Sequence, residues 1–165
     1  MSKVTMQCPA CERKTTHISI CGTELDVCQG GCGGIWFDNY ELKKFDEPHE
    51  EAGQLLDIEI NSNIKVDLET RRNCPKCVDI KLMRHYFSIK RKVVVDECAN
   101  CGGIWLDGGE LNKARGLYPS EEDKKIATEN LYNVLFQREI DKENEQRYTN
   151  KNKQIRIGNI LKFIH

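Results

Sequence analysis

The sequence has no long apolar run. No segment approaches the roughly eighteen consecutive apolar residues of a membrane-spanning helix, and the first residues lack the apolar stretch of a signal peptide. These absences predict a soluble, cytoplasmic protein. Its nine cysteines would then be kept as thiols, because the cytosol is a reducing compartment.

The sequence also lacks an excess of charge of either sign. It has 25 Lys and Arg residues and 26 Asp and Glu residues, which give a formal net charge of −1. Eight thiolates and two Zn²⁺ ions would take this charge to about −5. The total charge therefore gives no sign of nucleic acid binding, and local charge patterns are more informative about a partner.

Signatures of catalysis are missing as well. The sequence has no phosphate-cradling loop and no Ser/His/Asp set with a nucleophile motif. It also has no His-rich metal site of the kind that zinc hydrolases use. We therefore expect no enzymatic activity.

What the sequence does contain is a repeat. The segment Cys101–Leu111 reads Cys-Gly-Gly-Ile-Trp-Leu-Asp-Gly-Gly-Glu-Leu, and Cys32–Leu42 reads Cys-Gly-Gly-Ile-Trp-Phe-Asp-Asn-Tyr-Glu-Leu. Each copy follows another cysteine closely, and each is preceded by a Cys-Pro-x-Cys pair. The two copies divide the chain into two small units and a tail.

The spacing of the cysteines predicts two zinc sites. Short Cys-x-x-Cys loops can bring two sulfurs onto one ion at about 2.3 Å, and two such loops complete a tetrahedral site. A site without an open position is structural rather than catalytic. The alternatives are a disulfide framework or buried reduced thiols, which the two-plus-two spacing disfavours. Cys21 lies outside the paired cysteines, and we interpret it as a small strand residue.

The rest of each unit predicts its local structure. The glycine after the last cysteine stands where a positive φ is typical, and Ile-Trp supplies the bulky apolar groups that so small a unit needs beside its metal. Asp38-x-x-Glu41 and Asp107-x-x-Glu110 have the spacing of a capping box, so we predict a short helix after each Asp.

Polar and apolar residues alternate between the cysteine pairs. Segments 17–21 and 24–27 flank Gly22 as the strands of a hairpin would, and 93–96 is a strand ahead of Cys98. The predicted divisions of the chain are a first unit, a linker, a second unit and a C-terminal region, at residues 1–47, 48–70, 71–117 and 118–165.

These motifs resemble the transcription-factor-IIB-type zinc-finger (zf-TFIIB) family, a bacterial group of small zinc-ribbon domains often found in tandem. The resemblance covers residues 6–45 and 72–116. It implies that each unit is a zinc ribbon. Together with the hairpins and helices expected from the residues, this gives a small metal-stabilised α+β fold, with two tandem zinc ribbons, each a β-hairpin plus a short helix, followed by a C-terminal α-helix. The resemblance also implies two Zn²⁺ per chain, with the ligands Cys8, Cys11, Cys28, Cys32, Cys74, Cys77, Cys98 and Cys101.

One departure from the repeat concerns the first ligand set. Three residues separate Cys28 from Cys32, whereas two separate Cys98 from Cys101. The intervening residues include two glycines, which are flexible enough to absorb the insertion. We therefore keep Cys28 as a ligand.

The second unit differs from the first in charge. From Arg71 to Lys92 there are eight Lys or Arg residues and one Asp. Aromatic residues lie among them, as in proteins that bind single-stranded nucleic acid, where cations contact phosphates and rings stack on bases. The alternative is a solvated hairpin that offsets the charge of its own zinc site. The candidate nucleic-acid-binding residues are Arg84, Tyr86, Phe87, Lys90, Arg91 and Lys92.

The chain beyond the second unit predicts a helix over about 121–147. Ser120 and Asp123 mark its start, and a stripe at helical spacing follows, formed by Ala127, Leu131, Val134 and Leu135. This stripe favours packing within the protein over a partner site. Residues 150–154 are predicted to be a polar loop, and 155–165 a basic, apolar segment that docks back on the protein.

Together these features predict a zinc-binding protein with two structural four-cysteine sites, of a regulatory, transcription-associated or nucleic-acid-associated type. Its partner would be nucleic acid or the transcription machinery, as the basic hairpin and the resemblance both suggest. The alternative is a protein-interaction adapter, which the near-neutral charge favours. In an adapter, zinc only fixes the ribbons, and the C-terminal helix binds a protein partner or forms a homo-oligomer.

Overall fold

The computed structural model describes residues 6–48, 50–77 and 79–161. The chain divides into two compact units, one that ends at Asp123 and one that starts at Lys124. In the described ranges, no helix combines the length and the apolar character needed to cross a membrane.

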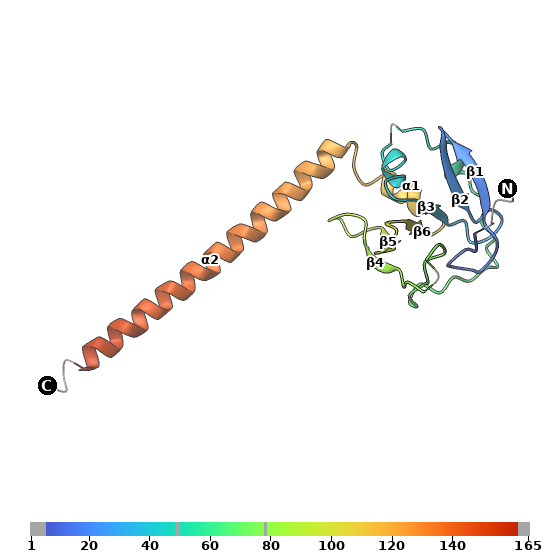
Figure 1. The fold of residues 1–165 in the computed structure, drawn as a ribbon. Helices are drawn as coiled ribbons and strands as arrows, with labels where there is room; N and C mark the ends of the chain where they lie inside the picture. Colours follow the sequence, from blue (N-terminus) through green and yellow to red (C-terminus); the bar gives the residue numbers. More distant parts are fainter. Residues whose placement is uncertain (1–5, 49, 78, 162–165) are drawn as a thin grey trace. The chain divides into compact units, whose positions relative to one another are not determined.

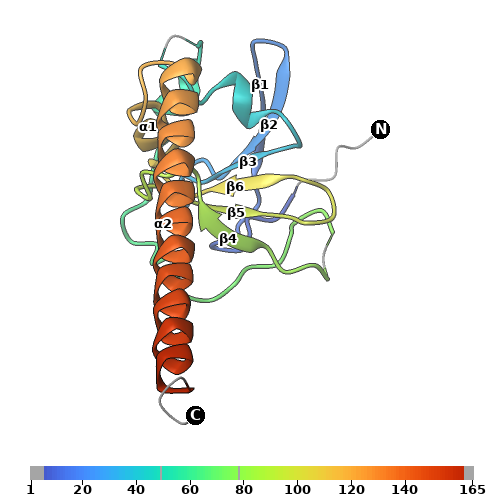
Figure 2. The same cartoon turned by 90° about the vertical axis from the view of Figure 1, so that its left-hand side faces the viewer.

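The strands of the described residues form one antiparallel sheet (Figure 1). The first repeat supplies β1 (Thr16–Ile20), β2 (Thr23–Val27) and β3 (Ile35–Phe37), and the second supplies β4 (Met83–Tyr86), β5 (Val94–Glu97) and β6 (Ile104–Leu106). Their order is β1-β2-β3-β6-β5-β4, and β3 pairs antiparallel with β6 (Figure 2). The two repeats are thus joined edge to edge and related by an approximate twofold axis between β3 and β6.

The predicted first hairpin is confirmed. Ile20 pairs with Thr23 across the two-residue turn of Cys21 and Gly22, whose φ angles are 50° and 76°. Two positive φ angles in succession define a type I′ turn, which matches the twist of the strands that it joins. The alternation of the sequence buries every second residue of β2 and leaves the others on the opposite face.

The short helices start later than the capping-box spacing predicts. The first repeat has a single 3₁₀ turn, η1 (Leu42–Lys44), and the second has α1 (Glu110–Arg115). Before each of them the chain takes a positive φ, 68° at Tyr40 and 78° at Gly109. A right-handed helix cannot include such a residue, so each helix begins only after it.

The linker between the repeats, in its described residues 48 and 50–70, contains η2 (Gly53–Leu56), whose Leu55 is buried. The guanidinium group of Arg115, at the end of α1, donates hydrogen bonds of 3.0 and 2.7 Å to the backbone carbonyls of Pro48 and Glu50. The second repeat therefore holds the start of the linker.

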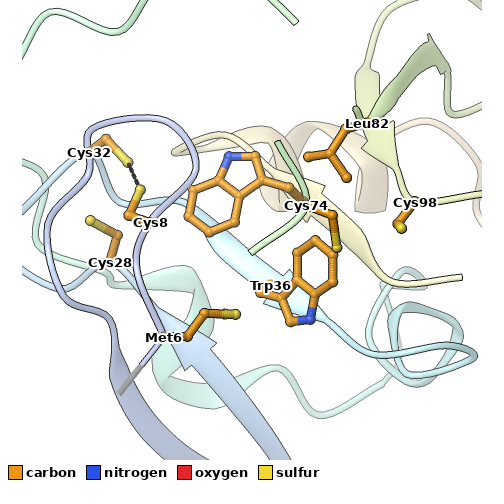
Figure 3. Close-up of a cluster of buried hydrophobic side chains, with 9 residues drawn as sticks. Met6, Cys8, Cys28, Cys32, Trp36, Cys74, Leu82 and Cys98 are labelled. Atoms are coloured by element: carbon orange, nitrogen blue, oxygen red, sulfur yellow. Dashed lines mark hydrogen bonds between the residues drawn. The ribbon is translucent and has the colours of Figure 1, made fainter. Parts of the chain in front are cut away.

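The buried core is shared between the repeats. The division of the sequence into two small units makes a single large core unexpected, but Met6, Trp36, Leu82 and Trp105 form one buried cluster with cysteines of both repeats (Figure 3). Both tryptophans are 1% exposed. The cluster spans both repeats because β3 pairs with β6, which brings the two indole rings together.

The C-terminal helix is longer than predicted. α2 (Glu121–Leu161) is one continuous helix (Figure 1), so the predicted end near 147 and the polar loop at 150–154 are wrong. No Gly or Pro interrupts residues 121–157, and Lys and Gln are good helix formers. The start is as predicted, with the Asp123 N–H donating to Ser120 Oγ at 3.2 Å. Residues 155–165 are predicted to dock back on the protein, but their side chains lie outside the described residues.

Candidate metal centres

Eight cysteine sulfurs gather in two groups of four. Within each group, all four Sγ atoms lie within 4.8 Å of one another. We call these groups the first and second quartets, and they consist of Cys8, Cys11, Cys28 and Cys32, and of Cys74, Cys77, Cys98 and Cys101. Both quartets match the ligand sets that the sequence predicts.

The two repeats build the second half of each quartet in the same way. Cys28 N–H donates to the carbonyl of Gly34, and Cys98 N–H donates to that of Gly103, both at 2.9 Å. Such a bond closes the turn on which the last two cysteines of the quartet stand. The glycine after each last cysteine has the predicted positive φ, 74° in the first repeat and 67° in the second.

The insertion in the first repeat is absorbed as expected. Gly30 takes a φ of 61°, and Gly31 N–H donates to the carbonyl of Cys28 at 3.2 Å. The chain thus makes a wider turn between Cys28 and Cys32. Both sulfurs still reach the quartet.

The sulfur positions fit a tetrahedral zinc ion. Four ligands at about 2.3 Å from zinc place their sulfurs about 3.8 Å apart. In the first quartet Cys8 lies 3.5 Å from Cys32, and Cys11 lies 3.4 Å from Cys28. In the second quartet Cys74 Sγ lies 3.8 Å from Cys101 Sγ. Four thiolates complete the coordination of zinc, which is the arrangement of a structural site.

The thiols within each quartet have opposed pKa shifts. A hydrogen bond with Cys32, followed by burial, raises the pKa of Cys8, and the same bond lowers the pKa of Cys32 to about 6. Burial raises the pKa of Cys74 to about 12. Burial also opposes the ionisation of Cys98, but backbone N–H donors, that of Cys101 first, outweigh it and lower its pKa to about 7. Each quartet thus holds protons that a bound cation would displace.

Hydrogen-bond donors surround the sulfurs. The N–H groups of Ala10 and Cys11 lie 3.4 Å from Cys8 Sγ. In the second quartet, Cys77 N–H lies 3.3 Å from Cys74 Sγ, and Asn100 Nδ2 lies 3.3 Å from Cys77 Sγ. Donors of this kind favour the charged thiolate, which is the form that binds metal.

Each tryptophan packs against the metal-binding turn of the other repeat. Trp36 and Trp105 are direct partners in the β3–β6 pairing. A Cβ atom on Gly34 would overlap the ring of Trp105, and one on Gly103 would overlap the ring of Trp36. The second glycine of each Gly-Gly pair therefore permits this close approach. The Gly-Gly-Ile-Trp motif predicts packing and turns, but it carries no sign that the contact crosses between the repeats.

The Asp and Glu of each repeat have separate roles. Trp36 Nε1 donates to Asp38 at 3.0 Å, and Trp105 Nε1 donates to Asp107 at 2.9 Å. The Glu three residues further on accepts the backbone N–H of the Asp, at 2.7 and 3.0 Å respectively. Only the Glu half of the capping box is thus formed, while each Asp side chain orients an indole ring.

The second repeat contains a buried ion network that was not predicted from the sequence. The Arg72 side chain is 4% exposed and donates to Asp96 at 3.1 Å and to Asp107 at 2.7 Å. Arg84 donates to Asp96 at 2.8 Å. In the sequence, the one sign of this network is an acidic residue, Asp96, next to the basic hairpin. The ion pair between Arg84 and Asp96 depends on the β4–β5 register, which places these two residues opposite each other.

The candidate nucleic-acid-binding residues do not form one group. Besides its ion pair, Arg84 donates to the carbonyl of Leu68. Lys90 Nζ donates to the carbonyl of Leu117 and lies 4.0 Å from the centroid of the Tyr118 ring. These two cations therefore have partners within the protein, and Phe87 is half-buried.

Three of the candidates stand at the tip of the β4–β5 hairpin. Tyr86 is 52% exposed, and the Arg91 guanidinium carbon lies 5.9 Å from the centroid of its ring. Arg91 and Lys92 are both exposed. We call Tyr86, Arg91 and Lys92 the hairpin tip.

Cys21 lies apart from both quartets. It stands at the exposed turn of the first hairpin, and its thiol donates to a carboxylate oxygen of Glu51 at 3.2 Å. Cys21 belongs to neither quartet. The prediction that it is a strand residue is wrong, because its φ of 50° places it in the type I′ turn between β1 and β2.

Comparison with known protein families identifies the same two repeats. The family described as "Transcription factor zinc-finger" matches residues 7–47 and 73–115. A search of curated proteins and a search of solved structures found no match. The two matched segments coincide with the repeats and span half of the chain, and each contains one complete quartet. The chain therefore belongs to the transcription factor zinc-finger family, as a tandem pair of zinc ribbons with one zinc-binding quartet in each.

Proposed function

We propose that this zinc-binding protein is a non-enzymatic regulatory protein of the transcription-associated kind, which binds single-stranded nucleic acid through the hairpin tip of its second ribbon. In this proposal the zinc ions fix the ribbons and take no part in a reaction. The closed arrangement of both quartets supports a structural role for the metal.

The charge difference between the repeats supports this choice of surface. Residues 7–47 hold four Lys or Arg and seven Asp or Glu, a balance of −3, while residues 73–115 hold eight and five, a balance of +3. Since each quartet contributes the same charge when it is loaded, the difference remains in the metal-bound protein. A polyanion would therefore approach the second ribbon.

The observation that carries the proposal is the exposed ring of Tyr86 with the Arg91 guanidinium group beside it. An exposed aromatic face can stack on a base, and a neighbouring cation can contact a phosphate. Lys92 adds a second exposed cation next in the chain. Arg84 and Lys90 are not part of this surface, because Arg84 forms an ion pair with Asp96 and Lys90 donates to the carbonyl of Leu117.

The test is a titration of the zinc-loaded protein against fluorescent single-stranded DNA and RNA at two salt concentrations. Changing Arg91 and Lys92 together to alanine should weaken binding. The slope of the logarithm of the binding constant against the logarithm of the salt concentration should also become shallower, by about 0.7 for each lost phosphate contact. The matched control changes Arg13 and Lys14, two exposed cations of the first ribbon, and should leave the affinity nearly unchanged. Equal effects of the two double changes would contradict the proposal.

A second pair of variants separates stacking from charge. Tyr86→Ala removes the ring, whereas Tyr86→Phe keeps it. If the ring stacks on a base, only the alanine variant should bind more weakly, by an amount typical of base–aromatic stacking, about 1 to 3 kcal/mol. Equal affinity of both variants would remove Tyr86 from the surface.

A second candidate function is a protein-interaction adapter, which α2 favours. Among its described side chains, which end at Gln154, the larger apolar ones are exposed, and they include Leu131, Val134, Leu135 and Phe136. Exposed apolar residues along one helix are typical of association with another helix. Light scattering of the full chain tests this function. A dimer that Leu135→Glu converts to a monomer would support an adapter that associates through α2.

A further inference from the structure

The outer side of β1 is open in the part of the chain that the structure describes. β1 is an end strand of the sheet and pairs there with β2 alone. The turn of this hairpin has two residues, so Ile20 and Thr23, which close it, form a hydrogen-bonded pair, and the pattern alternates from there. The backbone N–H and C=O groups of His17 and Ser19 therefore point away from β2.

A groove of about 710 Å³ lies along this edge, between β1 and the linker. Thr16 and Ile18 line it from the strand, on one face because they are two residues apart. Gln54, Asp57 and Ile58 line it from the linker. The groove thus has an apolar part, formed by the two isoleucines, and an acidic residue beside it.

The linker is fixed where it forms the groove. The carbonyl of Glu59 accepts the N–H of Gly30 at 3.0 Å, and Asn61 N–H donates to the carbonyl of Gly31 at 2.9 Å. Both bonds tie the linker to the metal-binding turn of the first ribbon. The groove is therefore built by the folded ribbon rather than by a loose loop.

The surroundings of the edge are acidic on both faces of the hairpin. Residues 50–60 hold four Asp or Glu and no Lys or Arg, and Glu51 and Asp57 are exposed. On the opposite face, His17 lies between Glu24 and Asp26, at 2.5 and 3.4 Å. Among the cations of this ribbon, Lys44 already donates to the hydroxyl of Thr23, and Arg13 and Lys14 precede the start of β1. The acidic residues of the hairpin and the linker still outnumber these cations. A basic ligand is therefore favoured at this edge.

We propose that the β1 edge binds an extended, basic segment of a partner protein by strand addition. The backbone groups of His17 and Ser19 pair with the added strand, which is how an open sheet edge recognises a peptide. Alternate side chains of the added strand enter the groove beside Ile18 and Ile58, and the others face Glu24 and Asp26. The hairpin tip lies in the other ribbon, so this proposal stands independently of nucleic acid binding.

The probe is a fluorescent octapeptide of alternating Lys and Val, titrated against the zinc-loaded full chain and followed by anisotropy. This peptide can place valines in the groove and lysines over the acidic face. An octapeptide of alternating Glu and Val is the control for charge and should not bind. Equal binding of the two peptides, or binding of neither, would overturn the proposal.

Backbone methylation of the probe tests strand pairing directly. Alternate N–H groups of a strand point to the same side. In an antiparallel added strand the N–H groups of the Lys residues face β1, so N-methylation at the Lys positions prevents pairing. In a parallel added strand the N–H groups of the Val residues face β1, so N-methylation at the Val positions prevents it. One methylated isomer should therefore lose affinity by about tenfold or more, as two hydrogen bonds are lost. The other isomer should bind like the parent peptide. Retained affinity of both isomers would mean that only charge attracts the peptide.

Changes in the protein give the complementary test. Ser19→Pro removes an N–H group that faces away from β2, a position where an edge strand tolerates proline, and should weaken peptide binding by about tenfold. Ser19→Ala keeps this N–H group and removes only the hydroxyl, so it is the matched control and should leave peptide binding unchanged.

A charge reversal on the face opposite the groove keeps the proposal testable if Ser19→Pro loses its zinc. Glu24, whose side chain is 52% exposed, lies on that face, so Glu24→Lys should weaken binding of the Lys/Val peptide and permit binding of the Glu/Val peptide. Unaltered binding of both peptides would overturn the proposal. A concentration-dependent dimer that Ser19→Pro abolishes, without peptide binding, would assign the edge to a second copy of the chain and equally overturn it.

Discussion

Trp36 lies directly opposite Trp105 where the two ribbons meet, and each indole ring packs on the second glycine of the other ribbon's Gly-Gly pair. That glycine accepts the N–H of a cysteine of the quartet through its carbonyl group. Each ring therefore supports the metal-binding turn of the opposite ribbon. The two ribbons should consequently fold as one unit, although each carries its own zinc site.

Gly34→Ala should destabilise the zinc-loaded protein because a Cβ atom would overlap the Trp105 ring. Overpacking of a buried site costs about 1 to 3 kcal/mol, which denaturant unfolding can measure. Gly116→Ala is the control, since Gly116 has a φ of −80° and a Cβ there would meet nothing closer than 3.6 Å. Similar stability of the two variants would argue against a tight contact between Gly34 and Trp105.

Cys101→Ser should release zinc from the second quartet and also loosen the first ribbon. Structural zinc binding of about 10 to 16 kcal/mol is coupled to folding, and the turn that would be lost supports the ring of Trp36. Native mass spectrometry should find one zinc ion, and the amides of β2 should exchange hydrogen faster. Cys21→Ser, outside both quartets, should keep two zinc ions. Wild-type protection of β2 in Cys101→Ser would show that the ribbons are energetically independent.

The quartets and the first hairpin could be predicted because their signals are local. Cys-x-x-Cys spacing and the alternation on either side of Gly22 each lie within a few residues. The pairing of β3 with β6 has no such signal, since strands of three residues show no periodicity and their contact spans the whole repeat. This pairing places buried residues of both repeats in one cluster.

The basic hairpin shows a second limit of sequence reasoning. The sequence predicts that Arg84 and Lys90 belong to a basic surface. In the structure, Arg84 forms an ion pair with Asp96, and Lys90 donates to the carbonyl of Leu117. Leu117 is far from Lys90 in the sequence, and the register that opposes Arg84 to Asp96 is set only by the folded hairpin. The number of basic residues in a segment therefore overestimates the number of cations that remain available to a partner.

Asp107→Ala should cost more than the loss of a helix cap. A helix cap would contribute about 1 kcal/mol, but the Asp107 side chain binds the Trp105 indole and the buried Arg72 instead. Removing one partner of a buried ion pair costs about 3 to 5 kcal/mol. Because the Asp107 side chain is 21% exposed and Arg72 keeps Asp96 as a partner, we expect an intermediate loss of about 2 kcal/mol.

Asp38→Ala provides the matched control for Asp107→Ala. Asp38 binds the Trp36 indole in the same way, but its charged partner is Lys76, and its side chain is 47% exposed. Exposed ion pairs contribute about 0 to 1 kcal/mol. Denaturant unfolding of the two zinc-loaded variants should therefore find the smaller loss for Asp38→Ala, and a reversed order would show that the buried Arg72 network contributes little.

Glu110→Gln should stabilise the protein at alkaline pH. Burial is the main cause that raises the pKa of Glu110 above the ordinary glutamate value, and the negative charge of Asp107 adds to it. The folded state therefore holds this proton to a higher pH than the unfolded state does. The stability that the proton contributes is complete below the ordinary pKa and is lost as the pH rises through the raised one. Glutamine keeps an acceptor for the Asp107 N–H without the buried charge.

The expected pH dependence gives this variant a distinctive signature. Denaturant unfolding of Glu110→Gln and the wild-type protein should show the largest difference near pH 8, and the difference should shrink as the pH falls toward the raised pKa of Glu110. Zinc content must be followed at each pH, since protons compete with metal for the thiolates. A constant difference at every pH, or a variant less stable than wild type near pH 8, would mean that the Glu110 carboxylate is stabilised by its surroundings rather than penalised by burial.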